Sequence, residues 1–277
     1  MMKTLTYWQR RLQNPLHQAY NENEQATRAW LTVYEQAKKD IEAELFHAYS
    51  KINKPNPLIS DFYRYNHLQK IEKQIEQSIL ELGAKEDDFT KSALRHATKL
   101  GSQTVSSVLQ IGVLNKSAID QMVKQPWAGG NYSDRIWKNK AQLIASMKSE
   151  LTSGIIQGKS IYQVANMMDA RLQVGRSQIQ RLVRTEYMHA LNQGQIETYR
   201  SNGYTKLRWV ATMDDKTSDI CRKRNGKEYS IDNLPDIPAH PNCRCTLVPV
   251  ISQAMIDEAA DEILQAKQYL KTLLEVK

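Results

Sequence analysis

The chain has 277 residues, of which 41% are hydrophobic and 25% charged, a balance typical of a folded globular protein rather than a disordered or membrane-spanning one. Its formal net charge of +8 is spread along the sequence, so it permits nonspecific contact with phosphate but is equally typical of a solvated surface. No apolar run approaches the roughly 18 residues of a membrane span, and the basic N-terminus lacks the apolar centre of a signal peptide. With only three cysteines, the chain is expected to be made and kept in a cytoplasm, without a membrane partner.

Residues 1–125 are expected to form long helices. Apolar residues recur at spacings of three and four between residues 26 and 49, and again between residues 68 and 82. Pro55 and Pro57 separate these two stretches, because each removes a backbone donor and restricts the residue before it. The apolar faces indicate packing between helices and carry no chemistry of their own.

Gly83 is expected to end the second of these helices, since glycine readily adopts the conformation that follows a helix C-terminus. Two further helices are predicted over residues 87–111 and 115–124. Asn115 or Ser117 is expected to cap the shorter one, because both side chains accept hydrogen bonds from free backbone N–H groups.

The segment 125–137 is the first irregular stretch, with a glycine pair at 129–130. Ser133 or Asp134 is predicted to cap a helix that begins near Arg135. The glycine pair is not followed by lysine and serine or threonine at P-loop spacing, so a bend between helices is favoured over a phosphate site.

Two helices are expected within residues 135–172, with a break at 158–160 and Ser160 as the cap of the second. A separate long helix is predicted to begin at Ser177 and to end against Gly203, because its apolar residues line one face over that whole length.

The pattern then changes to short strands, predicted within 204–213, 226–231 and 245–250. A final amphipathic helix is expected within 252–277. The predicted fold is therefore mainly α: an extended helical N-terminal body, followed by a small α+β module over residues 204–251 and closed by a terminal helix.

All three cysteines lie in this module, together with a histidine: Cys221, His240, Cys243 and Cys245. Three thiolates and an imidazole are a common ligand set for structural zinc, which prefers a tetrahedron of soft or borderline donors. A module this small gains folding free energy directly from a bound metal. The spacing of these residues differs from paired C-x-x-C knuckles, but the sequence still favours a structural zinc site.

Three alternatives remain open at this point. The cysteines can be small buried residues without a ligand. Cys221 can form a disulfide with Cys243 or Cys245 if the protein matures outside a reducing compartment. His240 and one cysteine can form a nucleophile and its base, although no third group that would orient them is identifiable.

Other polar residues give weaker signals. Arg184 and Glu186 lie in the predicted long helix on different faces, so each is expected to pair elsewhere, Glu186 with Arg176 or Arg208. His189 has no second ligand one helical turn away and is expected to be a packed or surface histidine. No residue is assigned a catalytic role.

The stretch from "RTEYMHALNQGQ" through "RWVATMDD", "NGK" and "HPNCRC" closely resembles the Mu F-like family of phage head morphogenesis proteins, also called minor head or minor capsid proteins. The resemblance covers about residues 125–251 and divides the chain into a long-helix region (1–125), a head morphogenesis domain (126–251) and a C-terminal helix (252–277). Many members carry a further cysteine three residues before the equivalent of Cys221. Here that position is Ser218, which leaves His240 as the fourth ligand.

The resemblance implies a non-enzymatic assembly role. Such proteins are low-copy components of tailed-phage or prophage heads, assembled in the bacterial cytoplasm and retained in the virion. The implied partners are the portal protein, the capsid or scaffold protein, and packaged double-stranded DNA contacted without sequence specificity. No small-molecule substrate is implied.

Two alternatives follow from the same resemblance. A nonspecific DNA-binding protein, ejected with the genome, would use the basic turn at Arg222, Lys223 and Arg224. A toxin-like transferase or other enzyme would use Arg184, Glu186 or His240, since domains of this family are sometimes joined to such transferases. Because the chain ends 26 residues after residue 251, no appended catalytic domain is expected.

Overall fold

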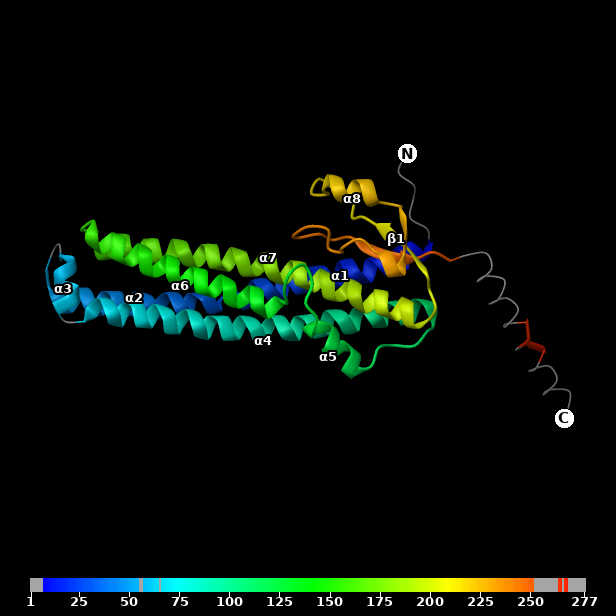
Figure 1. Ribbon diagram of the computed structural model, residues 1–277, viewed down its shortest axis with the longest axis horizontal. Coiled ribbons are helices and arrows are strands. Elements are labelled where there is room, and N and C mark those ends of the chain that lie inside the picture. Colours follow the sequence, from blue (N-terminus) through cyan, green and yellow to red (C-terminus); the bar gives the residue numbers. More distant parts are fainter. Residues whose placement is uncertain (1–6, 55–56, 65, 252–263, 266, 269–277) are drawn as a thin grey trace.

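A computed structural model describes residues 7–54, 57–64, 66–251, 264–265 and 267–268. It shows an elongated bundle of helices with a small sheet beside one end (Figure 1). The predicted fold class, a mainly helical body followed by a small α+β module, is confirmed. The helix expected over 252–277 lies outside the described residues, apart from the four helical residues in the two last ranges.

The first helices run along the bundle and end at a short cap at its far end. They are α1 (Tyr7–Trp30), α2 (Val33–Ile52) and α3 (Ile59–Arg64). The apolar pattern predicts an unbroken helix across the α1–α2 junction, and the structure interrupts it at Leu31 and Thr32. The turn tightens there because backbone bonds reach back three residues, as from Thr32 N to the carbonyl of Ala29 (3.4 Å).

Helix α4 (His67–Leu109) is one continuous helix, so the predicted stop at Gly83 is wrong. A Cβ at Gly83 would lie 2.9 Å from Cζ3 of Trp137, and the glycine therefore gives room to a neighbouring helix instead of ending its own. Helix α5 (Lys116–Lys124) follows, and the predicted cap is confirmed by the Asn115 side chain, which accepts from the N–H of Ala118.

Helix α6 (Tyr132–Ile156) begins three residues earlier than predicted. Its cap is Asn131, whose side chain accepts from the N–H of Asp134, while the Asp134 carboxylate accepts from the N–H of Asn131. This reciprocal pair satisfies two free donors at once, which explains why neither Ser133 nor Asp134 serves as the cap residue.

Helix α7 (Ile161–Ser201) merges two predicted helices into one. Ser160 caps it as predicted. The predicted start at Ser177 is wrong, since that hydroxyl donates to the carbonyl of Gln173 within the helix (3.0 Å). The end is confirmed, because Gly203 has a φ of 81° just beyond the last turn.

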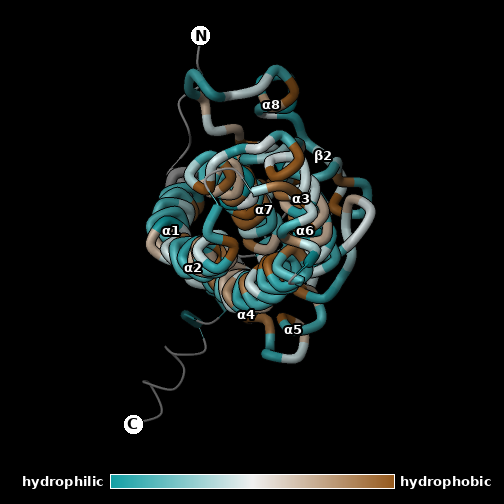
Figure 2. The backbone as a smooth tube through the Cα atoms, turned by 90° about the vertical axis from the view of Figure 1, so that its left-hand side faces the viewer, coloured by the Kyte–Doolittle hydropathy of each residue, from teal (hydrophilic) through white to brown (hydrophobic). Residues whose placement is uncertain are grey.

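The bundle core lies between α1, α2, α4, α6 and α7, and Figure 2 looks along these helices. Helices α4 and α7 approach most closely at two glycines. A Cβ at Gly101 would lie 2.1 Å from the carbonyl oxygen of Leu191, and a Cβ at Gly194 would lie 2.1 Å from that of Thr98. The side chains that fill the core include the fully buried Ile41, Leu45, Ile71, Ile75, Ile79, Met147, Leu151, Val183 and Leu191.

The module contains an antiparallel sheet of order β2-β1-β3, built from β1 (Lys206–Val210), β2 (Glu228–Ser230) and β3 (Thr246–Pro249). All three predicted strand segments are confirmed. Helix α8 (Asp219–Arg224) lies between β1 and β2, and a single 3₁₀ turn (Ile231–Asn233) follows β2.

A second apolar core joins this sheet to the bundle. Side chains from α1, α4 and α7 take part in it, so the module does not bury its apolar surface alone. Its members include Leu12, Val105, Ile196, Tyr199, Leu207, Trp209, Ile237, Leu247 and Val248.

Candidate metal centre and the adjoining groove

The three cysteine thiols meet beside the sheet. Cys221 lies in α8, whose N-cap Ser218 accepts from the N–H of Cys221, whereas Cys243 and Cys245 precede β3. The three Sγ atoms lie within 4.8 Å of one another, and Sγ of Cys221 is 3.6 Å from Sγ of Cys243. All three residues are buried and are free thiols. The predicted convergence of the cysteines is confirmed.

His240 lies at the edge of the thiol cluster. Its Nε2 is 3.2 Å from Sγ of Cys221, and its Nδ1 is 2.8 Å from the carbonyl oxygen of Pro241. Because a carbonyl only accepts, Nδ1 carries the proton and Nε2 presents its lone pair toward the thiols. Metal-bound histidines are commonly oriented by this kind of second hydrogen bond.

The three thiols fit three corners of a tetrahedral metal site. Two thiolates, each about 2.3 Å from a tetrahedral zinc, lie about 3.8 Å apart, close to the observed separation of Cys221 and Cys243. The hydrogen bond from Cys245 lowers the pKa of the Cys243 thiol to about 5, whereas burial raises the pKa of Cys221. One thiolate is therefore favoured already, and a divalent cation would supply the charge that stabilises the others. The three cysteines could hold a metal.

The loop that carries the histidine and the last two cysteines is fixed to α7. Asn242, with φ of 60°, turns the loop, and its N–H donates to the Thr185 hydroxyl (3.1 Å). The other side of the loop is held by His189, whose Nδ1 donates to the carbonyl of Ile237 (3.0 Å). This loop, from Asp236 to Cys245 and called the ligand loop below, is thus held by two hydrogen bonds to side chains of α7 that do not involve the thiols.

A second polar cluster lies next to this loop and was not anticipated from the sequence. Glu186 is buried and accepts from Nε1 of Trp127 (2.7 Å) and from Nη1 of Arg135 (2.5 Å). The Trp127 ring stacks on His189 with 3.9 Å between centroids. A buried carboxylate needs donors, and the sequence shows no spacing that singles out Trp127 and Arg135, which lie more than 50 positions upstream.

The predicted partners of Glu186 are wrong. Arg176 lies 3.6 Å from Glu35 of α2, and Arg208 pairs with Glu228 across the sheet (2.5 Å). Arg184, on the other face of α7 as expected, binds Glu24 of α1 through two nitrogens.

Burial dominates the protonation of this cluster. It raises the pKa of Glu186, against the hydrogen bond from Trp127 and the charge of Arg135. It also lowers the pKa of His189 to about 4, so this histidine is neutral and donates through Nδ1. Every polar side chain of the cluster is engaged with a neighbour, which makes it an anchor between α6, α7 and the loop rather than a site poised for proton transfer.

Comparison with known proteins identifies the region. Residues 145–248 match the family described as phage Mu protein F like protein. These residues form a phage Mu protein F like domain. The matched region, called the Mu F-like domain below, contains the C-terminal part of α6, all of α7, β1, β2 and all but the last residue of β3. It also contains all four residues of the predicted metal site.

One relative carries the name of an enzyme. Over 189 residues the chain is 25% identical to NAD(+)–arginine ADP-ribosyltransferase EFV of Enterococcus faecalis (strain ATCC 700802 / V583), covering 60% of this chain and 39% of the relative. The chain thus spans well under half the length of that protein. No solved structure matches the chain. Within the described residues, no helix is both long and apolar enough to cross a membrane.

The basic turn of the Mu F-like domain, predicted to contact DNA, is partly committed to its own fold. Arg222 donates to the carbonyls of Thr217 and Asp214, at 3.2 and 2.9 Å. Arg224 donates to the carbonyl of Asp236 and lies over the ring of Trp209. Only Lys223 projects without such a contact among the described residues, and DNA binding by this turn stays a prediction.

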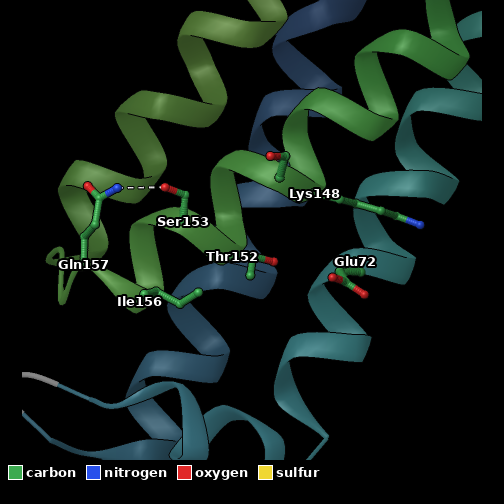
Figure 3. A pocket seen from close by; sticks show the side chains of 7 residues that line it. Glu72, Lys148, Thr152, Ser153, Ile156 and Gln157 are labelled. Carbon is green, nitrogen blue, oxygen red and sulfur yellow. Dashed lines mark hydrogen bonds between the residues drawn. The ribbon is translucent and has the colours of Figure 1, made fainter.

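Two surface hollows lie along α6. Figure 3 shows the one near the far end of the bundle, a shallow hollow of about 530 Å³ between α4 and α6. Its charged residues are Glu72 and Lys148, and Lys148 pairs with Glu76 outside it (2.6 Å), so no reactive groups converge there. The other hollow, of about 640 Å³, adjoins His240 and is called the loop groove below.

Proposed function

We propose that the protein is a minor head protein of a tailed phage or prophage, present in the virion and assembled in the bacterial cytoplasm. The observation that supports this most strongly is the match of residues 145–248 to the phage Mu protein F like family. The match extends over the whole thiol cluster and over Glu186, whereas Trp127 and Arg135, which bind Glu186, precede it.

The architecture suits a rigid connecting role. The module is joined to one end of a long bundle through a shared apolar core, and α3 caps the opposite end. Such a body presents two separated ends, one of which we assign to the portal protein and the other to capsid or scaffold protein. Contact with packaged double-stranded DNA would use the diffuse positive charge, without reading bases.

Mass spectrometry of purified virions tests this proposal. The encoding phage or prophage is induced, full heads are purified, and peptides of this chain are quantified against the major capsid protein. We expect a few copies per head, and a deletion strain should give non-infectious or malformed heads that are rescued by the wild-type chain. Absence of the chain from purified heads, together with normal infectious yield of the deletion strain, would refute the head assignment.

We also propose that the thiol cluster holds one structural zinc ion, with Cys221, Cys243 and Cys245 as thiolate ligands and His240 as the fourth. The three buried thiols within 4.8 Å of one another support the thiolate ligands. The contact of 3.2 Å between Nε2 of His240 and Sγ of Cys221 supports the fourth. Elemental analysis of protein purified without chelator should give about one zinc per chain, and Cys243→Ser with Cys245→Ser should lose both the metal and the folded module. A metal-free wild-type chain with an equally stable double variant would contradict it.

The named relative favours a second candidate, ADP-ribosyl transfer from NAD(+) to arginine. Incubation of the full chain with NAD(+) and an arginine derivative, with release of nicotinamide as the readout, decides it. We expect no release above the uncatalysed rate, since Glu186 is enclosed by Trp127 and Arg135. Release that disappears on Glu186→Gln would establish the enzyme instead.

A further inference from the structure

In the loop groove, α6, α7 and the ligand loop meet. Its volume of about 640 Å³ lies within the range of about 300–1,000 Å³ typical of ligand pockets. Its walls come from four parts of the chain: the turn with Trp127 and Ala128, α6, α7 and the loop from Asp236 to Pro241.

The walls are fixed before anything binds. On the α6 side, Arg135 is held by Glu186 and by the carbonyl of Trp127. On the loop side, Ile237 is bound to α7 through the imidazole of His189. A groove held in this way loses little conformational entropy when a ligand enters, which favours binding.

The lining combines apolar walls with uncommitted polar groups. Leu182, Pro238 and Ala239 provide apolar surface. Lys138 of α6 and Arg181 of α7 are exposed cations, one from each helix, and neither has a carboxylate partner among the ion pairs of the described residues. Three amide side chains also line the groove: Asn139, Gln142 and Gln178.

We propose that the loop groove binds an extended acidic peptide segment of a partner protein. Amide side chains pair with the N–H and C=O groups of an extended backbone, the apolar walls accept a side chain, and the two cations accept carboxylates. With Arg135, three cations line the groove against the two carboxylates of Glu186 and Asp236, so an acidic ligand is favoured.

A nucleic acid fits the groove less well. Single strands bind by stacking bases on aromatic rings, and the aromatic side chain of this groove, Trp127, is already stacked on His189 and covered by the guanidinium of Arg135. A duplex is convex and presents no segment narrow enough to enter a hollow of this size. The proposal rests on the groove alone and does not require the protein to be a head component.

Peptide selection on the full chain tests the proposal. A random dodecapeptide display library is panned on the purified protein, and the enriched sequences are synthesised with a fluorophore for anisotropy titration. We expect the selected peptides to be rich in Asp and Glu. Lys138→Glu combined with Arg181→Glu should weaken their binding at least tenfold, because two attractive contacts become repulsive.

The matched control is Lys39→Glu combined with Lys73→Glu, which changes the net charge equally on exposed faces of α2 and α4. This control should bind the peptides as the wild type does, and both variants should keep the wild-type thermal midpoint. Selection of no peptide family, selection of neutral or basic peptides, or equal weakening by both variants would overturn the proposal. So would displacement of the peptide by a twelve-nucleotide single-stranded DNA that itself loses affinity in the groove variant.

Discussion

Replacing Lys140 by methionine should destabilise the protein more than any other single loss of an ion pair among the described residues. Lys140 of α6 and Glu86 of α4 form a pair of 2.5 Å whose side chains are only 2% and 0% exposed. The Tyr34 hydroxyl of α2 lies between them, donating to Glu86 (2.5 Å) and accepting from Lys140 (2.9 Å). Three helices therefore share one buried polar contact.

The cost follows from what the substitution leaves behind. Glu86 Oε2 already lacks a hydrogen-bond partner, and without Lys140 only Tyr34 would compensate the carboxylate. Removing one partner of a buried pair costs about 3–5 kcal/mol, a factor of roughly 150 to 5,000 in the unfolding equilibrium. Lys148→Met is the matched control on the same helix, since its pair with Glu76 is 31% and 50% exposed and should contribute less than about 1 kcal/mol.

Urea unfolding followed by circular dichroism at neutral pH measures both variants. Burial raises the pKa of Glu86 in the wild type, and without Lys140 this carboxyl should take up a proton as the pH falls. When the pKa of a carboxyl is higher in the folded than in the unfolded state, stability is greatest below the unfolded pKa and is lost as the pH rises through the folded pKa. The free energy of unfolding of Lys140→Met should therefore approach that of the wild type as the pH falls toward 4.5. Equal midpoints for Lys140→Met and Lys148→Met at pH 7 would refute the assignment of a desolvated pair.

Three further predictions concern packing and pH. Gly194→Ala should cost about 3 kcal/mol or more in urea unfolding, because its Cβ would lie 2.1 Å from the carbonyl oxygen of Thr98, whereas Gly112→Ala, with nothing within 4 Å, should be neutral; similar midpoints for the two would contradict the close crossing. Because the pKa of His189 is lowered to about 4 in the folded state, its neutral imidazole contributes fully to the free energy of unfolding above pH 6.5. This contribution falls by up to about 3 kcal/mol as the pH drops to 4. In thermal melts at a series of pH values, His189→Phe should lose stability less steeply between pH 6.5 and 4 than the wild type. The hydrogen bond from Arg184 lowers the pKa of Glu24 to about 2, so this contact stabilises the fold above pH 4.5 and its contribution is lost toward pH 2. Glu24→Gln should reduce that loss. If His189→Phe or Glu24→Gln showed the wild-type dependence of stability on pH, the pKa shift of the residue replaced would be disproved.

Features set by local chemistry could be predicted from the sequence. Asn115 and Ser160 cap their helices because the side chain and the donors it satisfies are neighbours in the chain. The three strands follow from alternation over a few residues, and the proximity of Cys243 and Cys245 to each other is fixed by one intervening residue.

Features that depend on packing between distant segments could not be predicted from the sequence. Gly83 and Ser177 are typical signals of a helix boundary, yet both lie inside continuous helices. At Gly83 the absent side chain serves the neighbouring helix, because Trp137 and Lys140 occupy the space that a Cβ would take. Which glycine ends a helix and which lets another helix approach depends on a partner more than 50 positions away, and one sequence contains no record of that partner.

The same reasoning explains why the Glu186 cluster escaped prediction while the thiol cluster did not. Cysteine and histidine are rare and bind metals, so four of them within 25 residues indicate chemistry wherever the chain places them. Glutamate and arginine are common, and only burial distinguishes Glu186 from a surface residue. Yet this anchor holds Arg135 and, through the Trp127–His189 stack, lies against the residue that fixes Ile237 of the ligand loop. The geometry of the loop groove therefore depends on the less visible cluster at least as much as on the metal site beside it.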